Sequence, residues 1–368
     1  MFNAPLAEQH RKLFFPDRQT LGRYCLASDY RLDLFSTGEG GFAACLRYGP
    51  PGDTRLLVYD GGSAETGKQI VDHLRRHGGN PVIDDLVCSQ PGGEQCLGLF
   101  PILENLEVRQ FWMHRPWLYS DAVSQHLHGR HGGDTALARH VGNTAGLSFM
   151  LESLARRRKV PVAEPFQGAQ IGPMRVMSPH RDWYIHRLVP GFMVPPAEMP
   201  RRTPEFSRLL ERIGVPCGRP CSPDVESLDE SGECRPEMES SVVLYGLIGG
   251  EGILLTGNAG LGSLTNAAVY AEHLGIRVSE QLKFFQVPAS GDANHLSPSI
   301  LDRLIGAARP PSEKPPHLSA FLPPPSGRPE LPHRAVVHAL AERGAQIART
   351  EGRIFFGRSS LTRASSHD

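Results

Sequence analysis

The stretch Cys88-Ser89-Gln90-Pro91-Gly92-Gly93-Glu94-Gln95-Cys96-Leu97-Gly98-Leu99 carries the features from which we predict the fold of this chain. This polar, glycine-containing loop follows a short apolar run at residues 84–88, as expected for a buried strand. It precedes an apolar run at residues 99–103, as expected for the start of a helix. Loops between two such elements often hold functional side chains, because the elements on either side fix them in place. This loop is therefore the first candidate for a functional site.

A second strand with its own turn precedes this loop. Residues 55–59 are apolar and lead into Asp60-Gly61-Gly62, after which residues 66–77 have the spacing of an amphipathic helix. Residues 42–47 are expected to pair with this strand as a hairpin across the turn-forming residues 49–52. Strands and helices that alternate in this way predict an α/β protein.

The succession of strand, Asp-Gly-Gly turn, helix, strand and loop resembles the metallo-β-lactamase fold. Within that fold it resembles the hydrolase-like domain of bacterial DNA-uptake channel proteins of the ComEC type. In that family the loop usually reads Ser-His-Pro-Asp-Ala-Asp-His, followed by an apolar residue and Gly-Gly-Leu. Ser89 and Pro91 match this pattern. The remaining positions differ: Gln90 and Gln95 stand for the two histidines, and Gly92 and Glu94 stand for the two aspartates.

The resemblance extends into the second half of the chain. Residues 240–260 resemble the paired strands that end in Thr-Gly-Asp-Ala in the family, and Asn258 replaces the aspartate that bridges the metal ions. Residues 282–292 resemble the family's strand that ends in His-His-Gly-Ser, with Ala289 and Ser290 in place of both histidines. These three segments are therefore present in the family's order, and each has lost metal-binding side chains.

The resemblance implies a four-layer αββα sandwich of the metallo-β-lactamase type, which is an α/β fold. Residues 316–350 fit the family's last strand, its Pro-His-led helix and its terminal strand. A single domain then covers residues 1–368, with an N-terminal extension at residues 1–33 and a large helical and loop insertion at residues 118–238. Within the insertion, residues 144–159 have helical spacing, and a proline-rich polar stretch predicts a long exposed loop.

The substitutions remove the chemistry of a dinuclear metal site. Such a site needs neutral imidazoles and carboxylates that hold the ions and leave positions open for water. Amide and hydroxyl oxygens lack the charge and softness that favour zinc. Glu94 and Asp292 are the only nearby carboxylates. We therefore expect no tightly bound transition metal, no cofactor and no catalytic residue at the degenerate positions Gln90, Gly92, Glu94, Gln95, Asn258, Ala289 and Ser290.

Composition gives no sign of a broad binding field. The chain has 39 Lys and Arg against 39 Asp and Glu, so net charge does not indicate a nucleic-acid partner, although binding of nucleic acid stays open. The basic cluster at residues 156–159 is expected to be a solvated helix end rather than a phosphate site. A signal peptide and an apolar run of membrane-spanning length are not apparent, so we expect a cytoplasmic protein that does not bind membranes.

Cysteines and histidines in the insertion are weaker candidates for a metal site. Cys217, Cys221 and Cys234 lie close in sequence but lack the usual two-residue spacing and a clear fourth ligand, so we expect free thiols rather than a structural zinc. The histidines of residues 125–131 lie in a polar segment and not at the end of a buried strand. We expect surface histidines there rather than a relocated metal site.

Three functions remain open from the sequence. The leading hypothesis is a catalytically inactive metallo-β-lactamase-like protein that binds a protein partner, in a heteromeric complex or a homo-oligomer, as part of a bacterial assembly such as a defence system. The second is a metal-dependent nuclease or phosphoesterase with a rearranged site. The third is a module that binds a small molecule or nucleotide in the vacated pocket. The rearranged site would use Glu94, Asp292, His295 and His114, and candidate partner-binding anchors are Trp112, Trp117, Trp183 and Tyr184.

Overall fold

Two mixed β-sheets form the centre of the protein. The computed structural model describes residues 30–36, 42–78, 81–92, 94–119, 134–192, 228–308, 317–323, 330–348 and 352–356. Within these residues each sheet has seven strands, in the orders β14-β1-β2-β3-β4-β5-β6 and β13-β12-β11-β10-β9-β8-β7. The chain is therefore an α/β protein, as the sequence predicts.

The first sheet combines an antiparallel half with a parallel half. Strands β14, β1, β2 and β3 pair antiparallel, and β3, β4, β5 and β6 pair parallel. The predicted hairpin is confirmed, because Cys45 pairs with Val58 across the turn between β2 and β3. The strands are β1 (Tyr30–Ser36), β2 (Phe42–Tyr48), β3 (Arg55–Tyr59), β4 (Val82–Val87), β5 (Glu107–Trp112), β6 (Val162–Ala163) and β14 (Gly352–Phe356).

The second sheet has the same mixture. Strands β10 to β13 are parallel neighbours, while β7, β8, β9 and β10 pair antiparallel. The expected pairing within residues 240–260 is confirmed by β9 and β10, which turn at Gly249 and Gly250, both with positive φ. The strands are β7 (Gln170–Ile171), β8 (Met174–Ser178), β9 (Val243–Ile248), β10 (Glu251–Leu255), β11 (Leu282–Gln286), β12 (Leu318–Phe321) and β13 (Ala345–Ala348).

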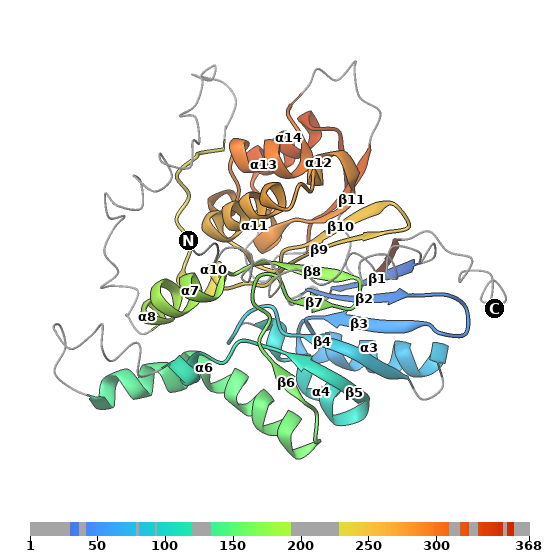
Figure 1. Cartoon of the computed structure of the whole chain (residues 1–368), viewed down its shortest axis with the longest axis vertical. Helices are drawn as coiled ribbons and strands as arrows, with labels where there is room; N and C mark the ends of the chain where they lie inside the picture. The colour runs from blue at the N-terminus through green and yellow to red at the C-terminus, as the bar shows by residue number, and fades with distance from the viewer. Residues whose placement is uncertain are drawn as a thin grey trace, which may run out of the picture.

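Helices cover the outer face of each sheet (Figure 1). On the first sheet they are α3 (Ala64–Gly78), α4 (Leu99–Asn105) and α6 (Asp134–Arg157). On the second they are α11 (Leu261–His273), α12 (Val278–Gln281), α13 (Pro298–Ile305) and α14 (Arg334–Glu342). Short helical turns are η1 (Glu94–Cys96), η2 (Pro116–Tyr119), α7 (Arg181–Trp183), η3 (Tyr184–Leu188), α8 (Val189–Gly191), α10 (Pro236–Glu239), η5 (Pro288–Gly291) and η6 (Ala293–His295).

Alternating side chains of the strands build separate layers of core. In β3, Leu57 packs between the two sheets, while its neighbour Val58 packs against the helices of the first sheet. In β11, Phe284 likewise points between the sheets and Phe285 toward α11, α13 and α14. Strands buried on both faces require nearly continuous apolar runs, which explains why these segments were recognisable in the sequence.

The expected boundaries of the extension and the insertion need correction. Residues 30–33, assigned to the extension, belong to β1, because Tyr30 and Leu32 are buried between the sheets. The segment 118–238 is not only an insertion, since it supplies β6 to the first sheet and β7 and β8 to the second. Its helix α6 begins at Asp134, ten residues before the expected start at residue 144, and packs Leu151 into the core. None of the helices in the described ranges is long and apolar enough to span a membrane.

Candidate functional site

The loop from Cys88 to Gly98 is held against the end of β3 by backbone contacts. Asp60 N donates to Val87 O at 2.8 Å, Gly61 N to Gln95 O at 3.1 Å, and Gly98 N to Gly62 O at 2.9 Å. A Cβ atom on Gly98 would lie 1.9 Å from Gly61 O, so only glycine permits this approach. The Asp-Gly-Gly turn and the loop thus form one packed unit.

Asp60 fixes the beginning of the loop. Its buried carboxylate accepts hydrogen bonds from Ser89 N at 2.7 Å and from Ser89 Oγ at 2.6 Å. Burial raises the pKa of Asp60 to about 7, although both bonds from Ser89 lower it. Ser89 O in turn accepts from Val242 N at 2.9 Å, and Tyr59 Oη donates to Val242 O at 2.7 Å. The loop of the first sheet is therefore tied to the strand entry of the second.

Two amides join the motif positions across the sheets. Asn258, just after β10, donates from Nδ2 to Gln90 Oε1 at 3.0 Å. Beside it, Gln286 at the end of β11 is buried and fully engaged: Oε1 accepts from Thr256 N and Gly257 N at 2.8 and 2.7 Å. Its Nε2 donates to Gly257 O and Val287 O at 3.0 and 2.9 Å. These bonds stabilise the turn that presents Asn258.

A small pocket lies where these segments meet, and we call it the amide pocket. Its volume is about 30 Å³, which is room for one or two water molecules. Three of the predicted positions, Gln95, Asn258 and Ser290, line it together, although they come from three separate segments. The full lining is Phe42, Asp60, Gln95, Gly257, Asn258, Gln286, Ser290 and Pro323.

The remaining degenerate positions lie around this pocket with other roles. Gly92 N donates to Ser148 Oγ of α6 at 3.0 Å. Ala289 N donates to Gly257 O at 3.4 Å, and Ala289 and Ser290 have φ of 47° and 57°, in the left-handed region that side chains rarely adopt. Glu94 begins η1, and its side chain lies outside the described residues.

The alternative ligands are engaged elsewhere. Asp292 accepts from Asn294 N at 3.1 Å as the N-cap of η6, and His295 Nδ1 lies 3.1 Å from Ala259 O. His114 is buried, and the centroid of its ring lies 4.4 Å from the ring centroid of Tyr184 and 4.8 Å from that of Phe166. Among the side chains described, no group of three or more His, Cys, Asp and Glu is arranged to hold a metal ion.

His114 and Tyr184 form a buried pair with unused polar atoms. Within the described part of the chain, the two ring nitrogens of His114 and the hydroxyl of Tyr184 have no hydrogen-bond partner. Burial lowers the pKa of His114 to about 3, so the ring is neutral at physiological pH. The expectation that Tyr184 is a surface anchor is corrected, because η3 turns its ring into the interior. Trp112, Trp117 and Trp183 are half-buried, so their role as anchors stays a prediction.

No disulfide bond joins the four cysteines of the described residues. Cys88 Sγ and Cys96 Sγ are buried, 3.4 Å apart, and both donate to Gln90 O, at 3.3 and 3.2 Å. Cys234 is half-buried and donates to Asn294 O at 3.2 Å. Cys217, Cys221 and the histidines of residues 125–131 lie outside the described residues, so the expectations for them stay predictions.

Sequence reasoning missed Asp60 and Gln286 as parts of the site. Asp60 was visible only as the acid of a glycine turn, and Gln286 only as a polar residue at the end of an apolar strand. A polar side chain at the end of a buried strand is a usable signal, because it must find hydrogen bonds inside the protein.

The fold and this pocket define an α/β protein with two facing mixed sheets and a polar site where their loops meet. No protein-family model matches the chain, and no curated protein matches it. The resemblance to the metallo-β-lactamase fold therefore stays a prediction from the sequence motifs.

Proposed function

We propose that the protein is a catalytically inactive member of the metallo-β-lactamase class. In this proposal its two sheets and outer helices are the four-layer αββα sandwich of that class, and the chain acts as a protein-binding subunit of a cytoplasmic bacterial assembly, for which a defence system is one setting. The layer order in Figure 1 supports the fold assignment, since helices flank a pair of facing sheets.

The hydrogen bond from Asn258 Nδ2 to Gln90 Oε1 carries the proposal. In the resembling family these two positions hold metal ions, whereas here the two amides satisfy each other. Asp60 is the one carboxylate in the lining of the amide pocket, and both of its oxygens already accept hydrogen bonds from Ser89. The polar groups are thus arranged to hold the two halves together rather than to bind a cation.

The size of the amide pocket argues against a small-molecule role. Sites for nucleotides and other small molecules usually have volumes of roughly 300 to 1,000 Å³. The amide pocket, at about 30 Å³, is about ten times smaller. A nucleotide bound in the amide pocket would require the Asn258–Gln90 contact to open, which argues against that pocket as a nucleotide site.

Zinc titration followed by calorimetry tests the inactive state. We expect no binding with submicromolar affinity by the purified full chain, and no nuclease activity with zinc, manganese or magnesium present. The triple variant Gln90→His, Gln95→His, Asn258→Asp restores three ligands of the family, two in the loop and one after β10, and is the matched comparison; we expect zinc binding to appear in it. Two stoichiometric ions in the wild-type protein, with activity lost in Glu94→Ala and His295→Ala, would overturn the proposal.

Co-purification tests the binding role. The tagged chain is expressed in its own host together with the genes beside its own, and isolated under native conditions. We expect a stoichiometric protein partner or a defined homo-oligomer by light scattering. A protein that stays alone and monomeric under these conditions contradicts the binding role, whatever the zinc titration shows.

A further inference from the structure

Exposed large apolar side chains lie on two adjoining elements, η2 and α6. In the described residues they are Leu118 of η2, Phe149 and Met150 of α6, with exposed fractions of 51%, 54% and 57%. The half-buried ring of Trp117 packs edge-on against Phe149 at 5.5 Å and connects them. Single exposed apolar residues are ordinary, but a cluster on adjoining elements is typical of a binding surface.

Three cations follow at the last residue of α6 and in the turn just after it. Arg157, Arg158 and Lys159 are exposed, and within the described part of the chain none of them has an ion-pair partner. Met150 and Arg157 are seven residues apart and share one face of the helix, so their Cα atoms lie about 10 Å apart along the axis. We call the whole set, from Trp117 and Leu118 through Phe149 and Met150 to these cations, the η2–α6 surface.

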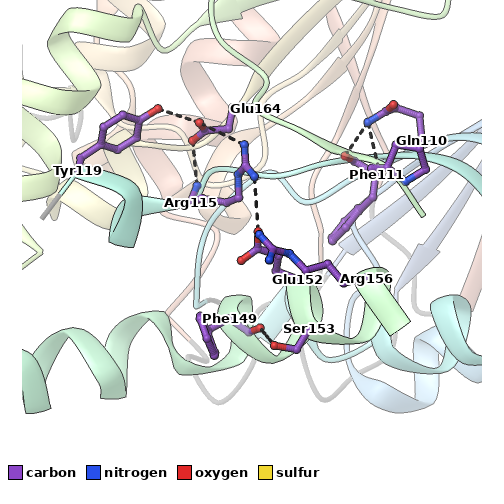
Figure 2. Close-up of polar contacts among 10 residues, drawn as sticks. Gln110, Phe111, Arg115, Tyr119, Phe149, Glu152, Ser153, Arg156 and Glu164 are labelled. Atoms are coloured by element: carbon purple, nitrogen blue, oxygen red, sulfur yellow. Dashed lines mark hydrogen bonds and ion pairs between the residues drawn. The ribbon is translucent and has the colours of Figure 1, made fainter. Parts of the chain in front are cut away.

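A chain of polar contacts fixes η2 on α6, as Figure 2 shows. Arg115 N donates to Glu164 Oε1 at 3.0 Å, and Tyr119 Oη donates to Glu164 Oε2 at 2.7 Å. Glu152 Oε1 lies 3.4 Å from Arg115 Nη1 and 2.7 Å from Arg156 Nη2. Residues on both sides of Leu118 are therefore anchored, so little conformational freedom is lost when a partner binds.

We propose that the η2–α6 surface binds an amphipathic, acidic segment of a partner protein. Apolar side chains of that segment contact Leu118, Phe149 and Met150, and its carboxylates contact Arg157, Arg158 and Lys159. The linear order of apolar and cationic groups along α6 suits a helix or extended peptide that lies along it. This inference rests on the proposed function, since it names the surface and the class of partner for that role.

Charge complementarity favours such a partner over a second copy of the chain. In an antiparallel pair of α6 helices centred on Met150, the cations of one copy lie opposite residues 141–143 of the other. The sequence from residue 134 to residue 151 contains a single carboxylate, Asp134, about 24 Å from Met150 along the helix. The cations would remain unpaired in that dimer. Phe149 is the one aromatic ring among the exposed large apolar side chains of the described residues, and Leu118 and Met150 beside it cannot stack on bases, so an apolar peptide face is favoured over nucleic acid.

Fluorescence anisotropy with the full chain tests this surface. The probe is a labelled synthetic helical peptide with leucines at positions i, i+3, i+4 and i+7 and glutamates along its remaining face at one end. A matched peptide carries glutamines in place of the glutamates. We expect saturable binding of the acidic peptide, at least about ten-fold weaker binding of the glutamine peptide, and a loss of at least about ten-fold in Phe149→Ser/Met150→Ser and in Arg157→Glu/Arg158→Glu.

Arg334→Glu, at the exposed start of α14 on the other sheet, is the matched charge control and is expected to bind like the wild type. Arg157→Gln/Arg158→Gln serves as a milder variant, and circular dichroism melting verifies that each variant folds. Absent binding of the acidic peptide, or equal binding by all variants, overturns the inference.

Two further arms identify other binders. The wild type is also tested with vesicles of phosphatidylcholine and phosphatidylserine and with a single-stranded oligodeoxynucleotide. Binding of either probe that is lost in the same two double variants would also overturn the inference. A negative result in the peptide experiment does not change the interpretation of the zinc titration, because the substituted residues lie outside the amide pocket. A metal-loaded wild-type protein would instead remove the proposed function without changing the peptide result.

Discussion

The amide pocket and the η2–α6 surface differ in what their polar and apolar groups do. In the amide pocket, Gln286 and Asp60 are buried and hydrogen bonded, and Asn258 bonds to Gln90. On the η2–α6 surface, Leu118, Phe149 and Met150 are exposed, and Arg157, Arg158 and Lys159 have no ion-pair partner among the described residues. In our proposal, the positions that would hold metal ions in the resembling family instead stabilise the fold. The proposed binding surface lies instead on a helix face that the family motifs do not include.

Asp60 gives the largest expected effect, and it concerns pH. Its pKa in the folded protein is about 7, above the ordinary value of 3.8, so the folded state holds the proton more tightly than the unfolded state does. The protonated carboxyl of Asp60 therefore contributes to the free energy of unfolding below pH 4, and this contribution is lost as pH rises to 7. The loss is on the order of 4 kcal/mol.

Urea unfolding of the wild type and of Asp60→Asn at pH 4, 5.5 and 7 measures this. Asparagine keeps the shape of the carboxyl and does not titrate, so the wild type should lose stability relative to the variant as pH rises. If the free energies of unfolding of the two proteins change in parallel with pH, the carboxyl of Asp60 titrates like a solvated one, and the predicted raised pKa is wrong.

Gln286→Ala is the next largest change. It removes the acceptor of Thr256 N and Gly257 N, two buried donors, and we expect a loss of about 3 kcal/mol in the free energy of unfolding. Gln170→Ala is the control, because that side chain is exposed and donates once, to Gly172 O, so its change should stay below about 1 kcal/mol. Equal effects of the two substitutions in urea unfolding would contradict a structural role for the amide pocket.

His114→Phe is expected to stabilise the protein by about 1 kcal/mol at pH 7, since the ring is buried among aromatic rings and its nitrogens lack partners. The gain should grow on acidification. The pKa of His114 is about 3 in the folded state, below its ordinary 6.5, so wild-type stability is complete above pH 6.5 and is lost as pH falls toward 3. Thermal melts at pH 7 and pH 5 measure this, with the exposed His338→Gln as control. A destabilised His114→Phe would indicate a polar contact that this site needs.

Phe149→Ser is expected to have the smallest effect on stability, below about 0.5 kcal/mol, because half of its ring already faces solvent. This sharpens the comparison, since the same substitution is expected to weaken binding of the acidic peptide strongly. A large loss of stability in urea unfolding would show that Phe149 belongs to the core rather than to the η2–α6 surface.

Much of the fold could be predicted from the sequence, because buried strands leave local signals. The hairpins β2–β3 and β9–β10 follow from apolar runs around glycine turns. Strand β1 was missed, since Arg31 and Asp33 made its sequence resemble a polar extension. In the structure Asp33 is buried and bonds to Arg31 at 3.0 Å and Arg47 at 2.9 Å, so a charged residue lies inside a sheet.

The site was predictable only where a motif marked it. The resemblance identified Gln95, Asn258 and Ser290, and the structure brings these three together. The hydrogen bonds of Gln286 join segments that are thirty residues apart, and no local pattern records them. The burial of Tyr184 depends on the π-helical turn η3 and on packing against His114 and Phe166, which a mixture of aromatic and charged residues does not reveal.

The thiols of Cys88 and Cys96 make the loop chemically observable. Both are shielded from solvent, and both donate to the carbonyl of Gln90. A thiol-alkylating reagent can reach them only when the segment detaches from the protein body. The rate at which the two thiols are alkylated in the native state therefore reports the rate of local opening of this loop, without any engineered probe.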